Sequence, residues 1–366
     1  MRAFDLQAAL RPALRGMTGY SPIAPPEEVA ARYGIPVERI VKLDANENPY
    51  GPSPRAVEAV RALTGANRYP DPDQRAIRTA LGARHGIDPD CIVAGAGSDE
   101  IIDLLFRAFV SPGDRVVVAS PTFGMYAFDG ELQGAEVVDV PLRDDWSFDA
   151  DALVEAASTA RLVCIPSPNN PTGNLLPRDL AEAIAATGAL LVVDEAYIEF
   201  AHAESLASAA ADGQSIVVLR TFSKWGGLAG LRIGYGIMPR ELARTLMLVK
   251  QPYGVNVAAE AAALASLEDV ALLDERACTL AGERERMAEA LRGLGWLEPA
   301  PSEANFTLVR LLRSDGVTVR EALRRRGIFV RTFDHARLAN HVRISAGRPE
   351  DTERLIAALK EIEEEL

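Results

Sequence analysis

Seven short runs of apolar residues recur in the middle of the chain, between Cys91 and Met238. Several of them are apolar throughout, which is typical of strands covered on both faces by helices. Stretches with helical periodicity separate them, for example Asp99–Phe109 and Arg178–Ala186. This alternation predicts a large doubly wound α/β domain with a mainly parallel, seven-stranded sheet. The expected strands are Cys91–Ala94, Arg115–Ala119, Val137–Val140, Leu162–Ile165, Leu190–Val193, Ile216–Leu219 and Ile233–Ile237.

The sequences flanking this region have different patterns. Residues 257–294 are rich in Ala, Arg and Glu and predict one long helix that links two lobes. The residues that follow predict a second, smaller α/β domain. Its strands are expected at Phe306–Leu311, Ile328–Val330 and His341–Ile344, and its helices near Val317–Arg325 and Pro349–Glu364. We therefore expect three parts. Residues 1–42 form an N-terminal segment that joins the small domain, residues 43–256 form the large domain, and residues 257–366 form the linking helix and the small C-terminal domain.

Composition narrows the class of protein. The chain has 366 residues, of which 48% are hydrophobic and 25% charged, as in ordinary globular proteins. A net charge of −13 argues against a nucleic-acid partner. Without a signal-like N-terminus or a membrane-length apolar run, we expect a cytoplasmic protein with no membrane partner. Three widely spaced cysteines and four histidines without paired spacing predict no metal site.

Lys224 is the most informative single residue. It is one of four lysines against 35 arginines, and it directly follows the expected strand Ile216–Leu219 and its Arg-Thr-Phe-Ser extension. Burial lowers the pKa of a lysine and makes its amine available for a Schiff base with an aldehyde cofactor. The alternative is a strand-end lysine that points into water.

Three other segments also follow expected strands, at the edge where open α/β sheets bind ligands. They are 95–98, 167–173 and 194–197. The small residues of 95–98 would let backbone amides close on a phosphate at a helix start, although Ser98 or Asp99 could equally be a plain N-cap. The loop 167–173 would present an asparagine amide to a ligand, or be only a turn. Ser223 and Arg232 flank Lys224 and could hold a phosphate.

Asp194 ends an apolar strand, where a carboxylate loses water and needs a partner. A protonated pyridine nitrogen would be such a partner, and Tyr197 is close enough in sequence to reach the same ring. An N-cap or a buried salt bridge is the alternative for Asp194. Together these groups describe a site for pyridoxal 5'-phosphate. They are a phosphate pocket, an acid for a ring nitrogen, amide and phenol donors, and a reactive amine.

Three motifs resemble the signature of the pyridoxal-phosphate aminotransferases of the aspartate aminotransferase fold, which is fold type I. They are Asn-Asn-Pro-Thr-Gly at 169–173, Asp-Glu-Ala-Tyr at 194–197 and Ser-Lys-x-x-Gly-Leu-Ala-Gly-Leu-Arg at 223–232. The resemblance is greatest to the histidinol-phosphate aminotransferases and spans nearly the whole chain. Its other matching segments are 43–52, 68–70, 121–126, 252–256, 302–306 and 342–345.

The resemblance implies a role for each matching position. Lys224, Asp194 and Tyr197 would be catalytic: Lys224 would bond to the cofactor and move the proton, and Asp194 would hold the ring nitrogen protonated. Tyr69 would reach the cofactor of the neighbouring subunit, which implies a homodimer. The implied cofactor contacts are Ala96, Gly97, Ser98, Phe123, Asn170, Asp194, Tyr197, Ser223, Lys224, Arg232 and Tyr69, and the implied substrate contacts are Tyr20, Asn46, Arg331 and Arg343.

The resemblance also implies an activity: transamination between L-histidinol phosphate and 2-oxoglutarate in histidine biosynthesis. An aromatic amino acid transaminase is the main alternative, and an amino-acid-phosphate decarboxylase or a cofactor-binding regulator are others. Two departures from the family pattern, Trp225-Gly226 after the lysine and Gly254 in the loop 252–256, are expected near the side chain of the substrate.

Overall fold

The computed structural model describes residues 4–17, 19 and 25–365. All seven expected central strands are present in one sheet with the order β2-β8-β7-β6-β5-β3-β4. Neighbours pair in parallel except β8, which is antiparallel to β2 and β7. The prediction of a mainly parallel, doubly wound sheet is therefore confirmed. The strands are β2 (Ile92–Gly95), β3 (Arg115–Val118), β4 (Glu136–Asp139), β5 (Leu162–Pro166), β6 (Leu190–Asp194), β7 (Ile216–Thr221) and β8 (Gly234–Ile237).

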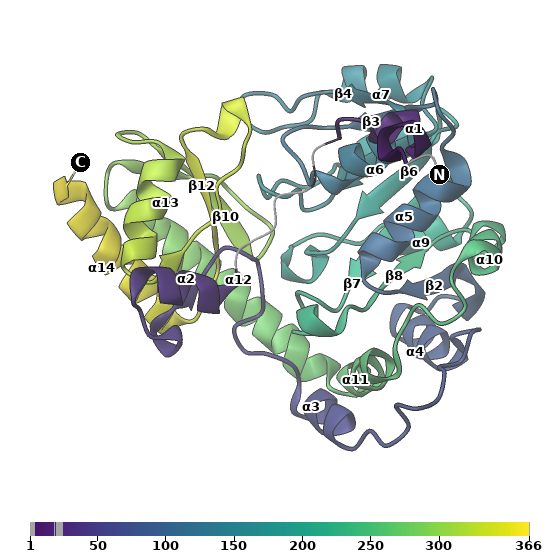
Figure 1. Ribbon diagram of the computed structural model, residues 1–366, viewed down its shortest axis with the longest axis horizontal. Helices are drawn as coiled ribbons and strands as arrows, with labels where there is room; N and C mark the ends of the chain where they lie inside the picture. The colour runs from purple at the N-terminus through teal and green to yellow at the C-terminus, as the bar shows by residue number, and fades with distance from the viewer. Residues whose placement is uncertain (1–3, 18, 20–24, 366) are drawn as a thin grey trace.

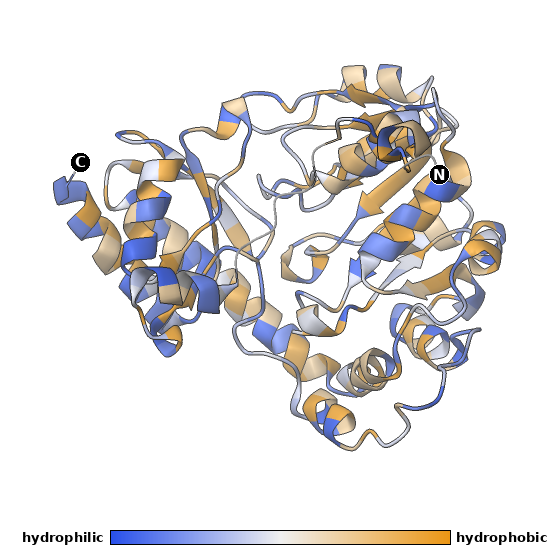
Figure 2. Cartoon of the chain, in the orientation of Figure 1, coloured by the Kyte–Doolittle hydropathy of each residue, from blue (hydrophilic) through white to orange (hydrophobic). Residues whose placement is uncertain are grey.

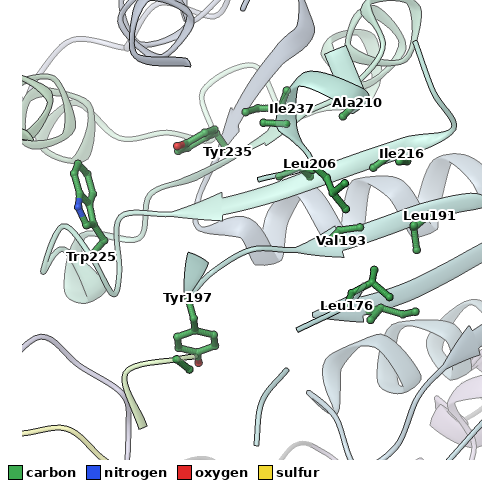
Figure 3. Close-up of a cluster of buried hydrophobic side chains, with 14 of the residues drawn as sticks. Leu176, Leu191, Val193, Tyr197, Leu206, Ala210, Ile216, Trp225, Tyr235 and Ile237 are labelled. Carbon is green, nitrogen blue, oxygen red and sulfur yellow. The ribbon is translucent and has the colours of Figure 1, made fainter. Parts of the chain in front are cut away.

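Helices cover both faces of this sheet because successive strand residues point to opposite sides (Figure 1). Val117, Val163 and Val193 pack on one face, and Val116, Cys164 and Val192 on the other. The strands are accordingly apolar along their length (Figure 2). Figure 3 shows part of the first core, where Leu191 and Val193 of β6 lie beside Ile216 of β7.

The helices divide between the two faces. Those that bury side chains in the first core are α4 (Arg75–His85), α7 (Ala150–Ala157), α8 (Arg178–Ala185), α9 (Ala207–Ala211), α11 (Val257–Glu268) and the first half of α12 (Val270–Arg292). Those on the second face are α5 (Ser98–Phe109), α6 (Met125–Gln133) and α10 (Arg240–Val249). The short helix α3 (Pro54–Arg61) packs against α11.

The C-terminal part forms a smaller unit with its own core. Its antiparallel sheet has the order β12-β10-β9, and a separate parallel pair joins β1 to β11. Helices α13 and α14 pack against this sheet on the left of Figure 1. The elements are β1 (Val41–Lys42), β9 (Leu297–Pro299), β10 (Phe306–Leu311), β11 (Ile328–Phe329), β12 (His341–Ser345), α13 (Gly316–Arg325) and α14 (Pro349–Glu365).

Two details differ from the sequence-based expectation. The long helix expected over 257–294 is two helices, because the chain leaves helical geometry at Asp269, whose carboxylate contacts Arg55. The N-terminal segment contacts both units. Helix α2 (Pro26–Tyr33) reaches the small unit, where the Tyr33 hydroxyl donates to Glu321 across 2.6 Å. Residues after α1 (Leu6–Ala9) lie instead against α6, where Arg11 donates to the Leu132 carbonyl.

Within the described residues, no helix is long and apolar enough to span a membrane, and no three His, Cys, Asp or Glu side chains gather as metal ligands. Cys91 and Cys164 are buried free thiols, and Cys278 is exposed.

Candidate active site

A cavity of about 610 Å³ lies at the carboxyl ends of β5, β6 and β7, between the large sheet and the small unit. This is the ligand edge expected for an open α/β sheet. Eleven of the residues singled out from the sequence line it: Asn46, Ser98, Phe123, Asn170, Asp194, Tyr197, Ser223, Lys224, Arg232, Arg331 and Arg343. The topology therefore brings together residues up to about 300 positions apart in the chain.

Lys224 points into this cavity from the turn after β7. Its Nζ donates a hydrogen bond to the Ala45 carbonyl across 2.9 Å. Burial, and to a lesser extent the positive charge of Arg343, lower the pKa of Lys224 to about 8. A far larger fraction of the amine is therefore neutral near physiological pH than in an ordinary lysine, as a nucleophile or a proton-transferring base requires.

Asp194 lies at the end of β6 and is buried. Its Oδ2 accepts the Tyr126 hydroxyl hydrogen at 2.8 Å, and its Oδ1 accepts from the Ala196 amide at 3.0 Å. Burial raises the pKa of Asp194 to about 6, although both hydrogen bonds act to lower it. Both donors are neutral, so a cation facing this carboxylate would stabilise its ionised form.

Tyr126 was not singled out from the sequence. It belongs to the 121–126 segment that resembles the family, and it is the second residue of α6, where a buried aromatic residue is typical of a hydrophobic core. It is fully buried, lines the cavity, and bonds to Asp194 through its hydroxyl.

One end of the cavity is suited to an anion. Gly97 begins α5 with a φ of +81°, and a Cβ there would collide with the Arg232 guanidinium. Arg232 also contacts Ser223 Oγ at 3.4 Å and pairs with Asp99 at 2.6 Å. The helix is capped by Gly97, and neither Ser98 nor Asp99 occupies that position. A helix start, a serine and an arginine are the donors that a phosphate needs.

Asn170, Tyr197 and Phe123 lie near the middle of the cavity wall. Asn170 Oδ1 accepts from Arg343 Nη1 at 2.6 Å, which fixes the orientation of the amide. The Tyr197 hydroxyl accepts from Asn46 Nδ2 at 3.0 Å. The Phe123 ring lies edge-on to Tyr126, with the ring centres 5.5 Å apart.

Two arginines stand opposite each other on the small-unit side. An antiparallel bridge pairs Arg331 with Arg343, so their side chains lie on the same face. Both guanidinium carbons are within 6 Å of the Phe333 ring centre, at 5.9 and 5.6 Å. Like charges placed directly opposite each other are unfavourable, and an anionic ligand between them would offset that cost.

The remaining expected residues have other positions. Tyr69 is 80% exposed and stacks on Tyr253 outside the cavity. Ala96 and Gly97 are not among the lining residues, and the Ala96 amide donates to Glu100 at 2.6 Å. Tyr20 lies outside the described residues.

Neither Trp225 nor Gly254 lines the cavity of this chain, so their expected place beside the substrate stays a prediction. Trp225 is buried, and its indole nitrogen donates to Asp274 at 2.7 Å. A Cβ on Gly254 would stand only 2.6 Å from the Glu100 carboxylate, so packing explains this glycine.

Comparison with known proteins shows the family of this chain. Residues 38–359 match the family described as aminotransferase class I and II. The chain belongs to that family. It is 47% identical to the histidinol-phosphate aminotransferase of Roseiflexus castenholzii, over 98% of this chain and 99% of that one. It is 42% identical to the chloroplastic histidinol-phosphate aminotransferase of Nicotiana plumbaginifolia, over 96% and 86%.

Among solved structures, the histidinol-phosphate aminotransferase from Sinorhizobium meliloti in complex with pyridoxal-5'-phosphate has a TM-score of 0.88. It is 30% identical and covers 98% of both chains. The protein is thus an aminotransferase with the type I fold of the pyridoxal-phosphate enzymes.

Proposed function

We propose that this aminotransferase uses pyridoxal 5'-phosphate to transfer the amino group of L-histidinol phosphate to 2-oxoglutarate, giving imidazole acetol phosphate and L-glutamate. The observation that carries the proposal is the pair Arg331 and Arg343, which stand opposite each other in the wall of the cavity that holds Lys224. The similarity to histidinol-phosphate aminotransferases over nearly the full chain supports the same substrate.

The cavity has the donor set that this cofactor requires. Lys224 would hold the aldehyde carbon, Asp194 the ring nitrogen, and Asn170 and Tyr197 the ring oxygen. Phe123 would cover one ring face. Ser98, Ser223 and Arg232, with the Gly97 amide, would bind the phosphate at the start of α5, and the Ala96 amide would join them by exchanging its bond to Glu100. The fit is supported by Asp194, a buried carboxylate whose two oxygens accept hydrogen bonds from neutral donors, the Tyr126 hydroxyl and the Ala196 amide.

The bound cofactor would supply an electrophilic carbon and an electron-accepting ring. The chain's own residues do the rest. Asp194, ionised above a pKa of about 6, keeps a proton on the ring nitrogen. The neutral Lys224 amine would remove the proton from the substrate carbon that bears nitrogen and return it to the carbon on the other side of that nitrogen, two atoms away. The apolar walls, including Phe123 and Phe333, keep water from competing for that proton.

The two arginines favour a substrate with an anionic end. Arg343 would bind the α-carboxylate of glutamate and 2-oxoglutarate, because its planar guanidinium matches a carboxylate. Arg331, with Tyr20 and Asn46, would complete the contacts to the phosphate of histidinol phosphate. An aromatic amino acid has no distal charge, so it would leave a desolvated arginine without compensation.

We further propose that the active unit is a homodimer in which Tyr69 reaches the neighbouring subunit's cofactor. The exposed stack of Tyr69 on Tyr253 supports this, since two aromatic rings in water are an unusual use of apolar surface.

A half-reaction tests the substrate. Purified protein loaded with pyridoxal 5'-phosphate is mixed with L-histidinol phosphate, and loss of the cofactor absorption band is followed, with L-phenylalanine and L-threonine O-phosphate as controls. Fast loss with histidinol phosphate alone supports the proposal. Faster loss with phenylalanine would make the protein an aromatic transaminase, and carbon dioxide released from an amino-acid phosphate would make it a decarboxylase.

A further inference from the structure

We propose that Ser345 and Asn46 are positioning residues that control how the Tyr197 hydroxyl acts on the cofactor. Tyr197 follows β6 of the large sheet, but the contacts that orient its ring and hydroxyl come from the other side of the cavity. The inference rests on the proposed function, since it assigns Tyr197 to the ring oxygen of pyridoxal 5'-phosphate.

Ser345 and Asn46 form a reciprocal pair. The Asn46 backbone N–H donates to Ser345 Oγ at 3.0 Å, and the Ser345 hydroxyl donates to Asn46 Oδ1 at 2.8 Å. Ser345 Oγ thus accepts from the Asn46 backbone and gives its single hydrogen to the Asn46 amide oxygen. The amide oxygen of Asn46 therefore faces Ser345, and its NH₂ group must face Tyr197, which it contacts at 3.0 Å. Ser345 thus sets which end of the Asn46 amide reaches the phenol.

The backbone of Asn46 is held just as firmly. Its φ is +55°, a left-handed conformation that asparagine tolerates better than most residues. Asn305 Nδ2 donates to the Asn46 carbonyl at 3.1 Å, and the Ser345 amide donates to the Leu43 carbonyl at 2.9 Å. Asn46 is 1% exposed, so water does not replace these contacts. Strands β10 and β12 of the small unit therefore fix a loop of the large one.

The ring of Tyr197 is fixed from the same side. It lies perpendicular to the Phe306 ring of β10, with the ring centres 5.1 Å apart. The small unit thus orients the ring through Phe306 and the hydroxyl through Ser345 and Asn46.

This arrangement affects proton chemistry. A hydrogen bond accepted by a phenol oxygen makes its O–H a stronger donor, since hydrogen bonds in a chain polarise one another. In the proposed site that O–H faces the cofactor's ring oxygen, so a stronger donor stabilises the negative charge there. The bound cofactor should then lose its titratable proton at a lower pH than it would without the Asn46 contact.

The experiment uses Ser345→Ala in the full-length protein loaded with pyridoxal 5'-phosphate. We expect the pH midpoint of the cofactor's absorption change to rise by roughly 0.5–1 unit, the size expected from weakening one buried hydrogen bond. Ser345→Thr keeps the hydroxyl and should return the midpoint to that of wild type. Ser266→Ala removes another fully buried serine, far from the cavity lining, and should leave the midpoint unchanged.

A double-mutant cycle with Tyr197→Phe tests the route. If Ser345 acts through Tyr197, Ser345→Ala shifts the midpoint in the wild-type background and has no effect in the Tyr197→Phe background. Equal shifts in both backgrounds would overturn the inference. If Ser345→Ala does not fold, Asn46→Gly serves instead, because glycine accepts the positive φ and removes only the amide.

The outcomes also separate this inference from the proposed function. Wild-type protein that shows no cofactor band, or that reacts with phenylalanine alone, would overturn the proposed function. Wild-type protein that reacts with L-histidinol phosphate, while Ser345→Ala and Asn46→Gly keep the wild-type midpoint, would overturn the positioning role alone.

Discussion

The Tyr126 hydroxyl donates a hydrogen bond to Asp194 Oδ2 across 2.8 Å, between two residues that both line the cavity. A hydrogen bond to a buried carboxylate stabilises its ionised form, typically by about 1.5–3 kcal/mol. In the proposed site Asp194 would have to be ionised to hold a protonated ring nitrogen, and Tyr126 would support that ionised state through its hydrogen bond.

Replacing Tyr126 by Phe should raise the pKa of Asp194 above its present value of about 6. We expect kcat to fall on the order of 10-fold near neutral pH and to recover partly at higher pH, since about 1.4 kcal/mol corresponds to a factor of ten. Steady-state rates between pH 6 and 9 measure this. Tyr235→Phe is the matched control, because Tyr235 is also buried and bonded, at 2.8 Å, to His85. Equal losses in both variants would contradict the assignment.

Replacing Lys224 by Ala should abolish turnover, because no other amine reaches the cavity's proton-transfer position among the lining residues. Pyridoxal 5'-phosphate should still bind through its phosphate and ring contacts, as seen by equilibrium dialysis. Lys250→Ala is the control: Lys250 is also largely buried, and its amine contacts only backbone carbonyls, of Gln251 and Pro252. A Lys224→Ala protein with near-normal rates would end the mechanism proposed above.

Capture of pyridoxal 5'-phosphate by the cofactor-free protein should depend on the pKa of Lys224, which is lowered to about 8. Only the neutral amine attacks an aldehyde, so the rate should rise with pH below 8 and level off above it. A free lysine side chain, with a pKa of about 10.4, keeps gaining rate beyond that point. Stopped-flow absorbance between pH 6 and 10 distinguishes the two, and a plateau only near pH 10 would refute the lowered pKa.

Asp194→Asn should stabilise the cofactor-free protein at neutral pH. The folded pKa of Asp194, about 6, exceeds the unfolded value, so its contribution to stability is greatest below about pH 4 and is lost as pH rises through 6. The asparagine side chain of the variant does not titrate, so it adds no such pH dependence to the stability. Between pH 4 and 7 the free energy of unfolding of the variant, measured in urea, should therefore rise by roughly 1–3 kcal/mol relative to that of wild type. The variant should lose nearly all turnover. An unchanged difference across that range would contradict the raised pKa.

Arg220 should be far more important for stability than an exposed arginine with similar contacts. It is buried on β7 and pairs with Glu195 at 3.1 Å and Glu199 at 2.7 Å. Arg220→Met leaves both carboxylates buried without that partner, which typically costs about 3–5 kcal/mol. Arg310→Ala breaks an exposed pair with Glu298 and should cost less than about 1 kcal/mol. Denaturant unfolding of both variants compares them directly.

The sequence predicted the large sheet well because its strands are covered on both faces and so are continuously apolar. Asp194 and Lys224 were found for the same reason, since each is a charged residue at or just beyond the end of such a run. The short strand Leu297–Pro299 was missed: three residues ending in a proline carry no periodic signal. The break at Asp269 was also missed, because the residues on both sides favour helix equally.

The finer contacts of the site depend on tertiary structure. Nothing in the sequence indicates that Arg331 and Arg343, twelve positions apart, face each other across a bridge. Nor does it show that the Asn46 side chain forms hydrogen bonds with Ser345 and Tyr197, which are 299 and 151 positions away in the chain. Such pairs arise only when the small unit closes one side of a cavity formed by the large one.

Arg343 and Ser345 are two residues apart on strand β12 and therefore share one face of it. One contacts the Asn170 amide and would bind the anionic end of a substrate, and the other orients the amide that contacts Tyr197. A strand is stiff over three residues, so a ligand that draws Arg343 inward displaces Ser345 by nearly the same amount. Substrate occupancy and the acidity of the cofactor's ring oxygen are then mechanically coupled through a single strand, and substrates that differ in their anionic group would tune the same phenol differently.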